Sequence, residues 1–358
     1  MAKKQSSTLR NSAAFRFARR VARPLRRTLG GKGPARAGVL MYHRVASEEN
    51  DPWNLCVNPI HFAEQMEVIA RHDARIDLAA LAGDGGYDRQ GRRLAVTFDD
   101  GYIDNITCAL PVLEQFEIPA TFFVVAGALG RNREFWWDGL ERAILGAGSL
   151  PDTLAMDLSG RAFEFELKEG DGLFPEWRAD HHDAQTSRQK LFLALWAEIV
   201  KLAPDDQDDA VDRLLVWAKK PIDAALDRVA ASAEDIARLA DHPLIRIGSH
   251  TVNHVSLPDI PTETQRDEIE RGQAILEELL GRRIDRFCYP YGRYDDGARQ
   301  IVKGLNVDFA CTSREGIATN RSDRLALPRL QICDLDGECF TQWLQSEHRL
   351  ISGRASVH

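Results

Sequence analysis

The sequence predicts an α/β fold, a distorted (β/α) barrel of about seven parallel strands with a large helical insertion. From residue 38 onward, short apolar runs alternate with amphipathic stretches, as in a parallel sheet flanked by helices. One interval of roughly 120 residues is far longer than the single crossover helix that joins two parallel strands. The expected strands are Gly38–Val45, Leu94–Phe98, Ala120–Val125, Ile245–Gly248, Arg286–Tyr289, Asp308–Thr312 and Leu325–Ile332.

Helices are expected between these strands, and their ends carry recognisable signals. The segment Pro59–Arg71 follows Asn58, a capping residue, and has proline at its first position. A second helix, Glu263–Leu280, ends before Gly281. The long interval, at about residues 136–240, is interpreted as the insertion. Its expected helices are Ser187–Lys201 and Asp206–Lys219.

Charge is distributed unevenly along the 358 residues. The whole chain carries a net charge of −8, but residues 1–36 hold eleven Lys or Arg and no acidic residue, which leaves −19 for the remainder. A body this acidic argues against nucleic-acid binding, which needs a basic face. The basic arm, residues 1–37, is interpreted either as a disordered tail or as a membrane-surface segment, because apolar residues recur at helical spacing among its arginines.

The sequence also bears on the cellular compartment. No stretch approaches the roughly 20 apolar residues that span a bilayer, and the first 30 residues lack the apolar segment of a secretory signal. The six cysteines are scattered without a CxxC pair, which predicts reduced side chains rather than a disulfide framework or a thiolate zinc site. We therefore expect a cytoplasmic protein, peripheral to the inner face of a membrane if the arm binds lipid.

Two adjacent carboxylates follow the strand Leu94–Phe98. In a parallel barrel, sites are built at the carboxyl ends of strands, which is where Asp99 and Asp100 fall. Neighbouring residues of an extended chain point to different sides, so one carboxylate can bind a metal while the other handles protons. A turn that caps the next helix is the alternative, and Gly101 fits both interpretations because it allows a tight turn.

Two histidines follow the strand Ile245–Gly248. His250 and His254 are separated by three residues, a spacing that brings both imidazoles within reach of one cation. With one carboxylate they make three protein ligands and leave a position open for water. A hydrogen-bonded structural role is the alternative for either histidine. A third strand leads into the turn Pro290–Gly292, whose backbone N–H groups could face a ligand.

Taken together, these segments resemble the polysaccharide deacetylase family, also called carbohydrate esterase family 4 or the NodB homology domain. The matching segments are TFDDGY at Thr97–Tyr102, HTVNH at His250–His254 and FCYPYG at Phe287–Gly292. The resemblance covers residues 38–135 and 241–335. It implies that residues 38–358 form a NodB-like deacetylase barrel into which the helical segment is inserted.

The resemblance implies a role for each motif residue. Asp99 would be the general base. A divalent metal, most often zinc, would be held by Asp100, His250 and His254. Such a metal lowers the pKa of a bound water toward about 7 and polarises the amide carbonyl of a substrate. The backbone N–H of Tyr291 would help the metal to stabilise the tetrahedral oxyanion.

Two departures from the common family pattern concern the acid and the base. Many members carry a Leu-x-x-His motif near the C-terminus, whereas this chain has it at Leu40–His43, an arrangement resembling the circularly permuted poly-N-acetylglucosamine deacetylases. His43 is therefore the expected general acid. Cys288 stands where many members have an arginine that holds the base in place. Arg329 on the last expected strand is the candidate replacement, with a structural role as the alternative.

The expected function is a metal-dependent hydrolase that removes an N-acetyl group from an amino sugar or glycan precursor. A cytoplasmic substrate would be a lipid-linked or nucleotide-linked sugar, or a glycan precursor at the inner face of a membrane. A deformylase of a formamido sugar would use the same site and is the nearest alternative. A non-catalytic carbohydrate-binding relative is an alternative of another class. Trp136 and Trp137, which open the insertion, are expected either to pack the insertion onto the barrel or to offer a platform for a sugar ring.

Overall fold

The computed structural model describes residues 34–168, 176–179, 182–223, 227–348 and 350. Within them the chain forms two compact units. The barrel unit contains residues up to 47, residues 55–131 and the chain from residue 230 onward, and the insertion unit contains residues 48–54 and 132–229. The basic arm predicted at residues 1–37 lies outside the described residues except for its last four.

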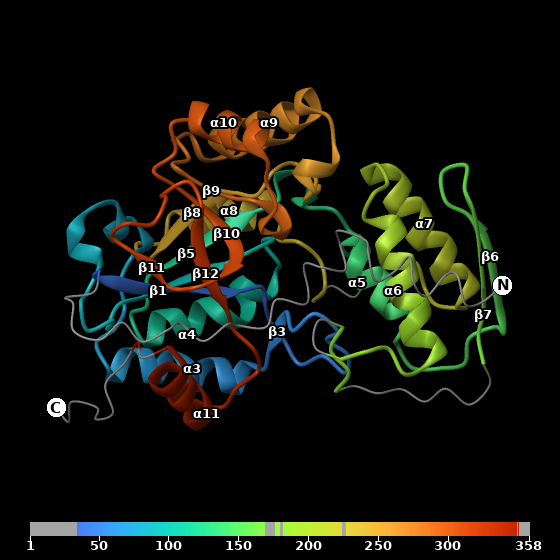
Figure 1. Cartoon of the computed structure of the whole chain (residues 1–358), viewed down its shortest axis with the longest axis horizontal. Coiled ribbons are helices and arrows are strands. Elements are labelled where there is room, and N and C mark those ends of the chain that lie inside the picture. The colour runs from blue at the N-terminus through green and yellow to red at the C-terminus, as the bar shows by residue number, and fades with distance from the viewer. Residues whose placement is uncertain (1–33, 169–175, 180–181, 224–226, 349, 351–358) are drawn as a thin grey trace. The chain divides into compact units, whose positions relative to one another are not determined.

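Seven parallel strands close into a barrel, as predicted (Figure 1). Their order around the barrel is β1-β4-β5-β8-β9-β10-β12, and β1 pairs with both β12 and β4. A short strand, β11 (Ala318–Thr319), adds to β1 in the antiparallel direction. The barrel strands are β1 (Arg36–Tyr42), β4 (Leu94–Phe98), β5 (Ala120–Val124), β8 (Ile245–Ser249), β9 (Arg286–Cys288), β10 (Phe309–Glu315) and β12 (Leu327–Gln331).

Helices cover the outside of the barrel. In Figure 1, the helices α3, α4 and α11 lie on one side of the strands, and α9 and α10 lie on the other. The predicted helix at Pro59–Arg71 is present with Asn58 as its cap, and the helix before Gly281 begins one residue earlier than expected. The covering helices are α3 (Pro59–Arg71), α4 (Leu110–Gln115), α8 (Ala233–Ala240), α9 (Thr262–Leu280), α10 (Asp296–Gly304) and α11 (Gly337–Gln342).

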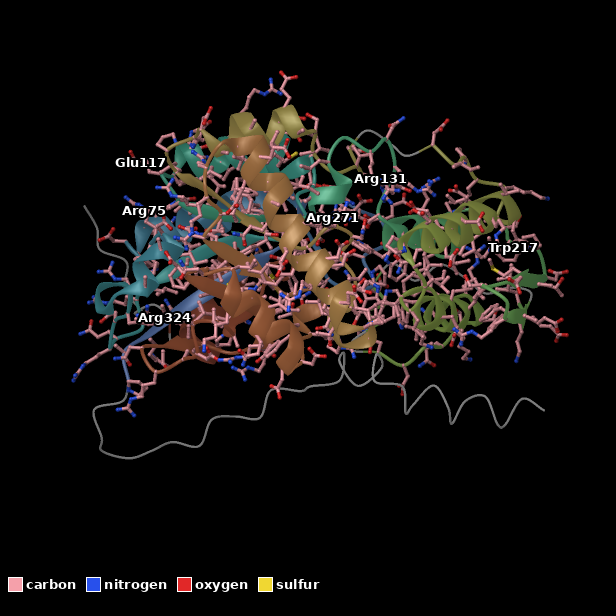
Figure 2. All side chains as sticks on the ribbon, turned by 90° about the horizontal axis from the view of Figure 1, so that it is seen from above. Arg75, Glu117, Arg131, Trp217, Arg271 and Arg324 are labelled. Atoms are coloured by element: carbon pink, nitrogen blue, oxygen red, sulfur yellow. The ribbon has the colours of Figure 1, made fainter. Side chains whose placement is uncertain are left out.

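Helix α9 has one face exposed to solvent and one face buried against the barrel. Its outer face carries charged side chains such as Arg271, labelled in Figure 2, whose side chain is 63% exposed and pairs with Asp267 at 2.9 Å. Its inner face is buried and includes the apolar residues Ile269 and Leu276. This division follows from the 3.6-residue period of the helix, which places residues three and four positions apart on one face.

Side chains alternate between the two surfaces of the barrel wall. On β4 and β5, Phe98 and Phe122 face the covering helices and stack with ring centroids 4.7 Å apart and planes 4° apart. The intervening positions face the barrel interior, where Phe123, Cys288 and Leu327 belong to one buried apolar cluster. The interior is therefore largely apolar, with Arg329 of β12 as a buried charged side chain beside Phe123.

The insertion unit is mainly helical, with α5 (Trp136–Ile144), α6 (Ser187–Ile199) and α7 (Pro204–Trp217). Both predicted insertion helices are present, each ending two residues earlier than expected. An antiparallel hairpin of β6 (Thr153–Asp157) and β7 (Ala162–Glu166) was not predicted. Residues 48–54 belong to this unit because Trp53 packs against Trp196, with ring centroids 5.1 Å apart.

The tryptophans at the start of the insertion are packed rather than displayed. Trp136 and Trp137 are 5% and 7% exposed, and Trp136 lies 5.9 Å from the ring of Trp196. Their burial within the insertion unit disagrees with the sugar-platform alternative, and the expected packing of the insertion onto the barrel stays a prediction. Among the described residues, no helix has the length and apolar character needed to cross a membrane.

Candidate active site

The predicted site residues lie at the ends of the barrel strands. Asp99 and Asp100 directly follow β4 and are each 2% exposed. His250 directly follows β8 and is 1% exposed, and His254 is 8% exposed in the loop beyond it. His43 follows β1. Because the strands are parallel, their carboxyl ends meet at one rim of the barrel.

Asp100, His250 and His254 form a compact donor set. The Oδ1 atom of Asp100 lies 3.5 Å from Nε2 of His250 and 3.4 Å from Nε2 of His254. Burial lowers the pKa of both imidazoles, so both rings are neutral at pH 7 and keep a lone pair for coordination. One carboxylate and two imidazoles whose donor atoms lie within 4.8 Å of one another fit a divalent cation.

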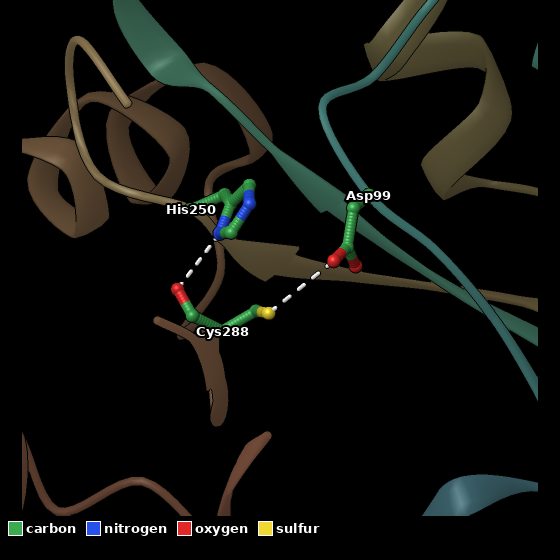
Figure 3. Close-up of side chains that lie close together, drawn as sticks. All are labelled: Asp99, His250 and Cys288. Carbon is green, nitrogen blue, oxygen red and sulfur yellow. Dashed lines mark hydrogen bonds between the residues drawn. The ribbon is translucent and has the colours of Figure 1, made fainter. Parts of the chain in front are cut away.

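A backbone carbonyl orients one of these imidazoles. The Nδ1 atom of His250 lies 2.8 Å from the carbonyl oxygen of Cys288 on β9 (Figure 3). A carbonyl only accepts, so Nδ1 carries the proton and Nε2, which faces Asp100, presents the lone pair. Ligating histidines in proteins commonly donate their other ring N–H in this way. The pairing of β8 with β9 thus fixes the tautomer that a metal site requires.

The second carboxylate, Asp99, has a different partner. Arg329 of β12 donates from Nη1 to Oδ1 at 2.7 Å and from Nη2 to Oδ2 at 2.5 Å. Its Nε also donates to the carbonyl oxygen of Thr312 at 3.0 Å, and its side chain is 0% exposed. Burial favours the neutral acid, but the guanidinium outweighs it and holds the pKa of Asp99 well below its usual range. Asp99 is therefore a fixed, ionised carboxylate.

A second group of possible ligands overlaps the first, formed by Asp99, His250 and Cys288 (Figure 3). The Nη2 atom of Arg329 lies 3.0 Å from Sγ of Cys288, as well as beside Asp99, so a cation there would face a guanidinium. Burial also raises the pKa of the Cys288 thiol well above its usual value, and a protonated thiol is a poor ligand. Charge therefore makes the group formed by Asp100 and the two histidines the better candidate for a cation.

His43 lies next to the second carboxylate. Its Nε2 is 4.0 Å from Oδ2 of Asp99, and its side chain is 14% exposed. The side chain of Asn105 donates from Nδ2 to the backbone carbonyl of His43 at 2.8 Å, which fixes the chain where β1 ends. Burial lowers the pKa of His43 to about 4, and Asp99 offsets only part of that effect. The imidazole is therefore neutral at pH 7.

Four residues of the site adopt left-handed backbone conformations. The φ angles are 71° for Asp100, 66° for Thr251, 56° for His254 and 56° for Tyr291. A residue with a side chain pays about 1–2 kcal/mol for this conformation. Such conformations persist only where the surroundings fix them, and they cluster at functional sites. The ring of Tyr291 packs edge-on against His254, with centroids 4.5 Å apart, so the third motif also reaches the donor set.

The structure thus brings six of the seven predicted residues to one rim of the barrel, and the seventh, Arg329, reaches Asp99 from within β12. The helix-capping alternative for the two aspartates does not apply, because Asp99 accepts from Arg329 and Asp100 faces the imidazoles. Sequence reasoning missed two polar supports of the site, Asn105 and Glu268. Asn105 lies a few positions after the aspartates, so its proximity was a usable signal. Glu268 lies on α9 and carries no local signal.

The fold and the donor set define a (β/α)-barrel protein with a candidate metal centre at its strand ends. Residues 86–149 and 218–310 match the family model described as polysaccharide deacetylase. The chain therefore carries a domain of the polysaccharide deacetylase family, and the family predicted from the motifs is confirmed. The closer relation to the circularly permuted subgroup stays a prediction.

Individual relatives are distant. YxkH of Bacillus subtilis (strain 168), provisionally named a polysaccharide deacetylase, is 23% identical over 114 residues, which are 32% of this chain and 40% of YxkH. BC0361, a polysaccharide deacetylase from Bacillus cereus, is 17% identical with a TM-score of 0.53, covering 86% of this chain and 69% of BC0361. IcaB from Ammonifex degensii is 19% identical with a TM-score of 0.51, covering 87% and 98%. Both structures share the fold.

The buried ion pair yields a prediction about stability. Arg329→Met leaves the Asp99 carboxylate buried without its cation, and we expect the free energy of unfolding to fall by about 3–5 kcal/mol. The double variant Asp99→Asn with Arg329→Met removes both charges and should lose less. Urea denaturation measures both, with Arg271→Met at an exposed ion pair as the control. A loss for Arg329→Met no larger than for the control would contradict this account.

Proposed function

We propose that this protein is a metal-dependent hydrolase, with Zn²⁺ as the metal, that removes an N-acetyl group from an amino sugar or glycan precursor. One observation carries the proposal: a donor set for a cation lies beside a separate, ionised carboxylate in a deacetylase-family barrel. Two imidazoles and one carboxylate are a ligand set of catalytic zinc sites. The family match supports deacetylation in general, and the choice of acetylated amino sugars is part of the proposal.

In this proposal, Asp100, His250 and His254 hold the cation, and Asp99 is the general base. A divalent cation held there would supply an acidified water and polarise the substrate carbonyl. Asp99 would accept a proton from the attacking water, and Arg329 keeps its carboxylate ionised and aligned for that role. The arginine from the last strand thus takes the place of the arginine that many relatives carry in the third motif.

The leaving amine needs a proton, which we assign to His43. Because His43 is neutral in the free protein, it must first receive a proton, and Asp99 is the neighbouring acid at 4.0 Å once it has taken one from water. His43 then donates from Nε2 to the amine as the C–N bond breaks. The backbone N–H of Tyr291 stabilises the oxyanion of the tetrahedral intermediate, and its turn next to His254 supports this assignment.

A direct test combines metal analysis of the purified protein with mass spectrometry on acylated amino sugars. The panel includes free, nucleotide-linked and lipid-linked N-acetyl sugars, their N-formyl counterparts and oligomeric glycans. The expected result is about one divalent cation per chain and a loss of acetyl from at least one substrate. Loss of formyl alone would indicate a deformylase. Metal-free protein without activity on any substrate would favour a carbohydrate-binding relative.

The two carboxylates are expected to respond differently to substitution. Asp99→Asn should keep the metal and lower turnover by about 10²- to 10⁴-fold, because it removes a general base. His250→Ala should lose both metal and turnover, because it removes a ligand. Metal content by atomic absorption and steady-state rates separate the two variants. An Asp99→Asn enzyme with near wild-type turnover would refute the assignment of the base.

His43 is expected to matter more for amides than for activated esters. An amine leaves only after protonation, whereas a phenolate leaves without help. His43→Ala should therefore lower the rate on an N-acetyl substrate by about 10²-fold or more and the rate on a nitrophenyl ester far less. Equal losses on both substrates would show that His43 is not the acid.

A further inference from the structure

The loop that joins the two candidate histidine ligands is held by a carboxylate from another helix. Glu268 of α9 accepts hydrogen bonds from the backbone N–H of Asn253 at 2.8 Å and of Val252 at 3.2 Å, both on Oε2. Its other oxygen, Oε1, accepts from Nδ2 of Asn253 at 2.7 Å. Three donors from two consecutive residues thus meet one side chain.

This carboxylate is buried. Glu268 is 6% exposed, whereas the charged residues of the outer face of α9, such as Arg271, are open to solvent (Figure 2). A buried carboxylate is costly unless it is well hydrogen-bonded, and here the three loop donors provide the bonds. The helix and the loop are therefore mutually dependent, since each satisfies buried polar groups of the other.

The helix backbone also fits closely against the loop. A Cβ atom added to Gly272, one turn after Glu268, would lie 2.7 Å from the carbonyl carbon of Thr251. On its other side the loop is fixed by the N–H of Gly127, which donates to the carbonyl of Val252 at 2.8 Å. The loop is thus clamped between α9 and the segment after β5.

These contacts with α9 and with the segment after β5 bear on His254, which does not directly follow a barrel strand. His250 is fixed by its place at the end of β8 and by its bond to the carbonyl of Cys288. His254 lies beyond the loop, at a left-handed φ of 56°, and Thr251 at the start of the loop has a φ of 66°. If Glu268 is removed, these strained residues can relax, and the imidazole of His254 moves away from Asp100.

We infer that Glu268 is a positioning residue of the metal centre, which sets metal affinity by holding His254 beside Asp100. The inference rests on the proposed metal-binding function, and it adds to that function a residue outside the three sequence motifs. Outer partners of metal ligands commonly contribute 10- to 100-fold to affinity. Glu268 acts here on the backbone of the ligand loop rather than on an imidazole.

The experiment measures metal affinity directly. Metal-free wild type, Glu268→Ala and Glu268→Gln are titrated with Zn²⁺ in competition with a chromophoric chelator, and the visible spectrum of each Co²⁺-loaded protein is recorded. Glu270→Ala is the matched control, because Glu270 is an exposed glutamate on the same helix, paired with Arg266. Circular dichroism is used to choose a temperature at which every metal-free variant is folded.

We expect Glu268→Ala to weaken Zn²⁺ binding by about 10- to 100-fold and to change the Co²⁺ spectrum, while Glu270→Ala matches wild type. Glu268→Gln should recover most of the affinity, because one amide oxygen can accept the backbone donors while the side chain of Asn253 turns to present its oxygen to the new NH₂. A positioning role predicts this rescue, and loss of helix stability alone does not.

Two results distinguish a failure of this inference from a failure of the proposed function. Wild-type affinity in a folded Glu268→Ala protein would overturn the inference and leave the proposed function intact. A wild type that binds neither Zn²⁺ nor Co²⁺ would overturn the proposed function and the inference with it. If Glu268→Ala does not fold, Gly272→Ala replaces it, because its added methyl presses on Thr251 while favouring the helix. Unchanged affinity in that variant would also overturn the inference.

Discussion

Backbone pairing of β1 with both β4 and β12 closes the barrel, and the arrangement of the candidate site depends on that closure. His43, Asp99 and His250 each follow a different strand, and His43 and His250 are more than 200 residues apart in the sequence. Because these strands belong to one parallel sheet, their carboxyl ends lie at the same rim. Closure also makes β12 a neighbour of β1, so that Arg329 reaches Asp99 through the interior.

At that rim, the two adjacent carboxylates have partners of different charge. Asp99 takes the guanidinium of Arg329, and Asp100, which has a left-handed backbone, turns toward two neutral imidazoles. Arg329 lies beside Asp99 and Cys288, so its charge disfavours a cation there and leaves the group formed by Asp100 and the two histidines as the candidate cation site. In the proposed function, the buried arginine would therefore have two effects. It keeps one carboxylate ionised, and it would favour cation binding at the other.

Local patterns predicted much of this arrangement. Apolar runs marked all seven barrel strands, because strands buried on both faces are continuously apolar. Asp100 and His254 could be proposed as candidate metal ligands because a ligand set leaves a spacing that can be read along the chain. Trp53 could not be placed in the insertion unit, because its partner Trp196 is more than 140 residues away. The β6–β7 hairpin was missed because its half-exposed strands lack the apolar runs that mark the barrel.

The turns after β4, β8 and β9 all contain left-handed residues, but these conformations are supported in two different ways. Asp100 and Tyr291, both left-handed, are each followed by a glycine with positive φ, and a Cβ on Gly292 would lie only 2.2 Å from the backbone nitrogen of Ser313. The histidine loop has no glycine, although it contains two left-handed residues. Within the loop, the N–H of His254 donates to Oγ1 of Thr251 at 3.0 Å, and from outside the carboxylate of Glu268 binds the residues between them. A motif glycine is visible in a sequence, whereas an anchor on a separate helix becomes visible only in the folded chain.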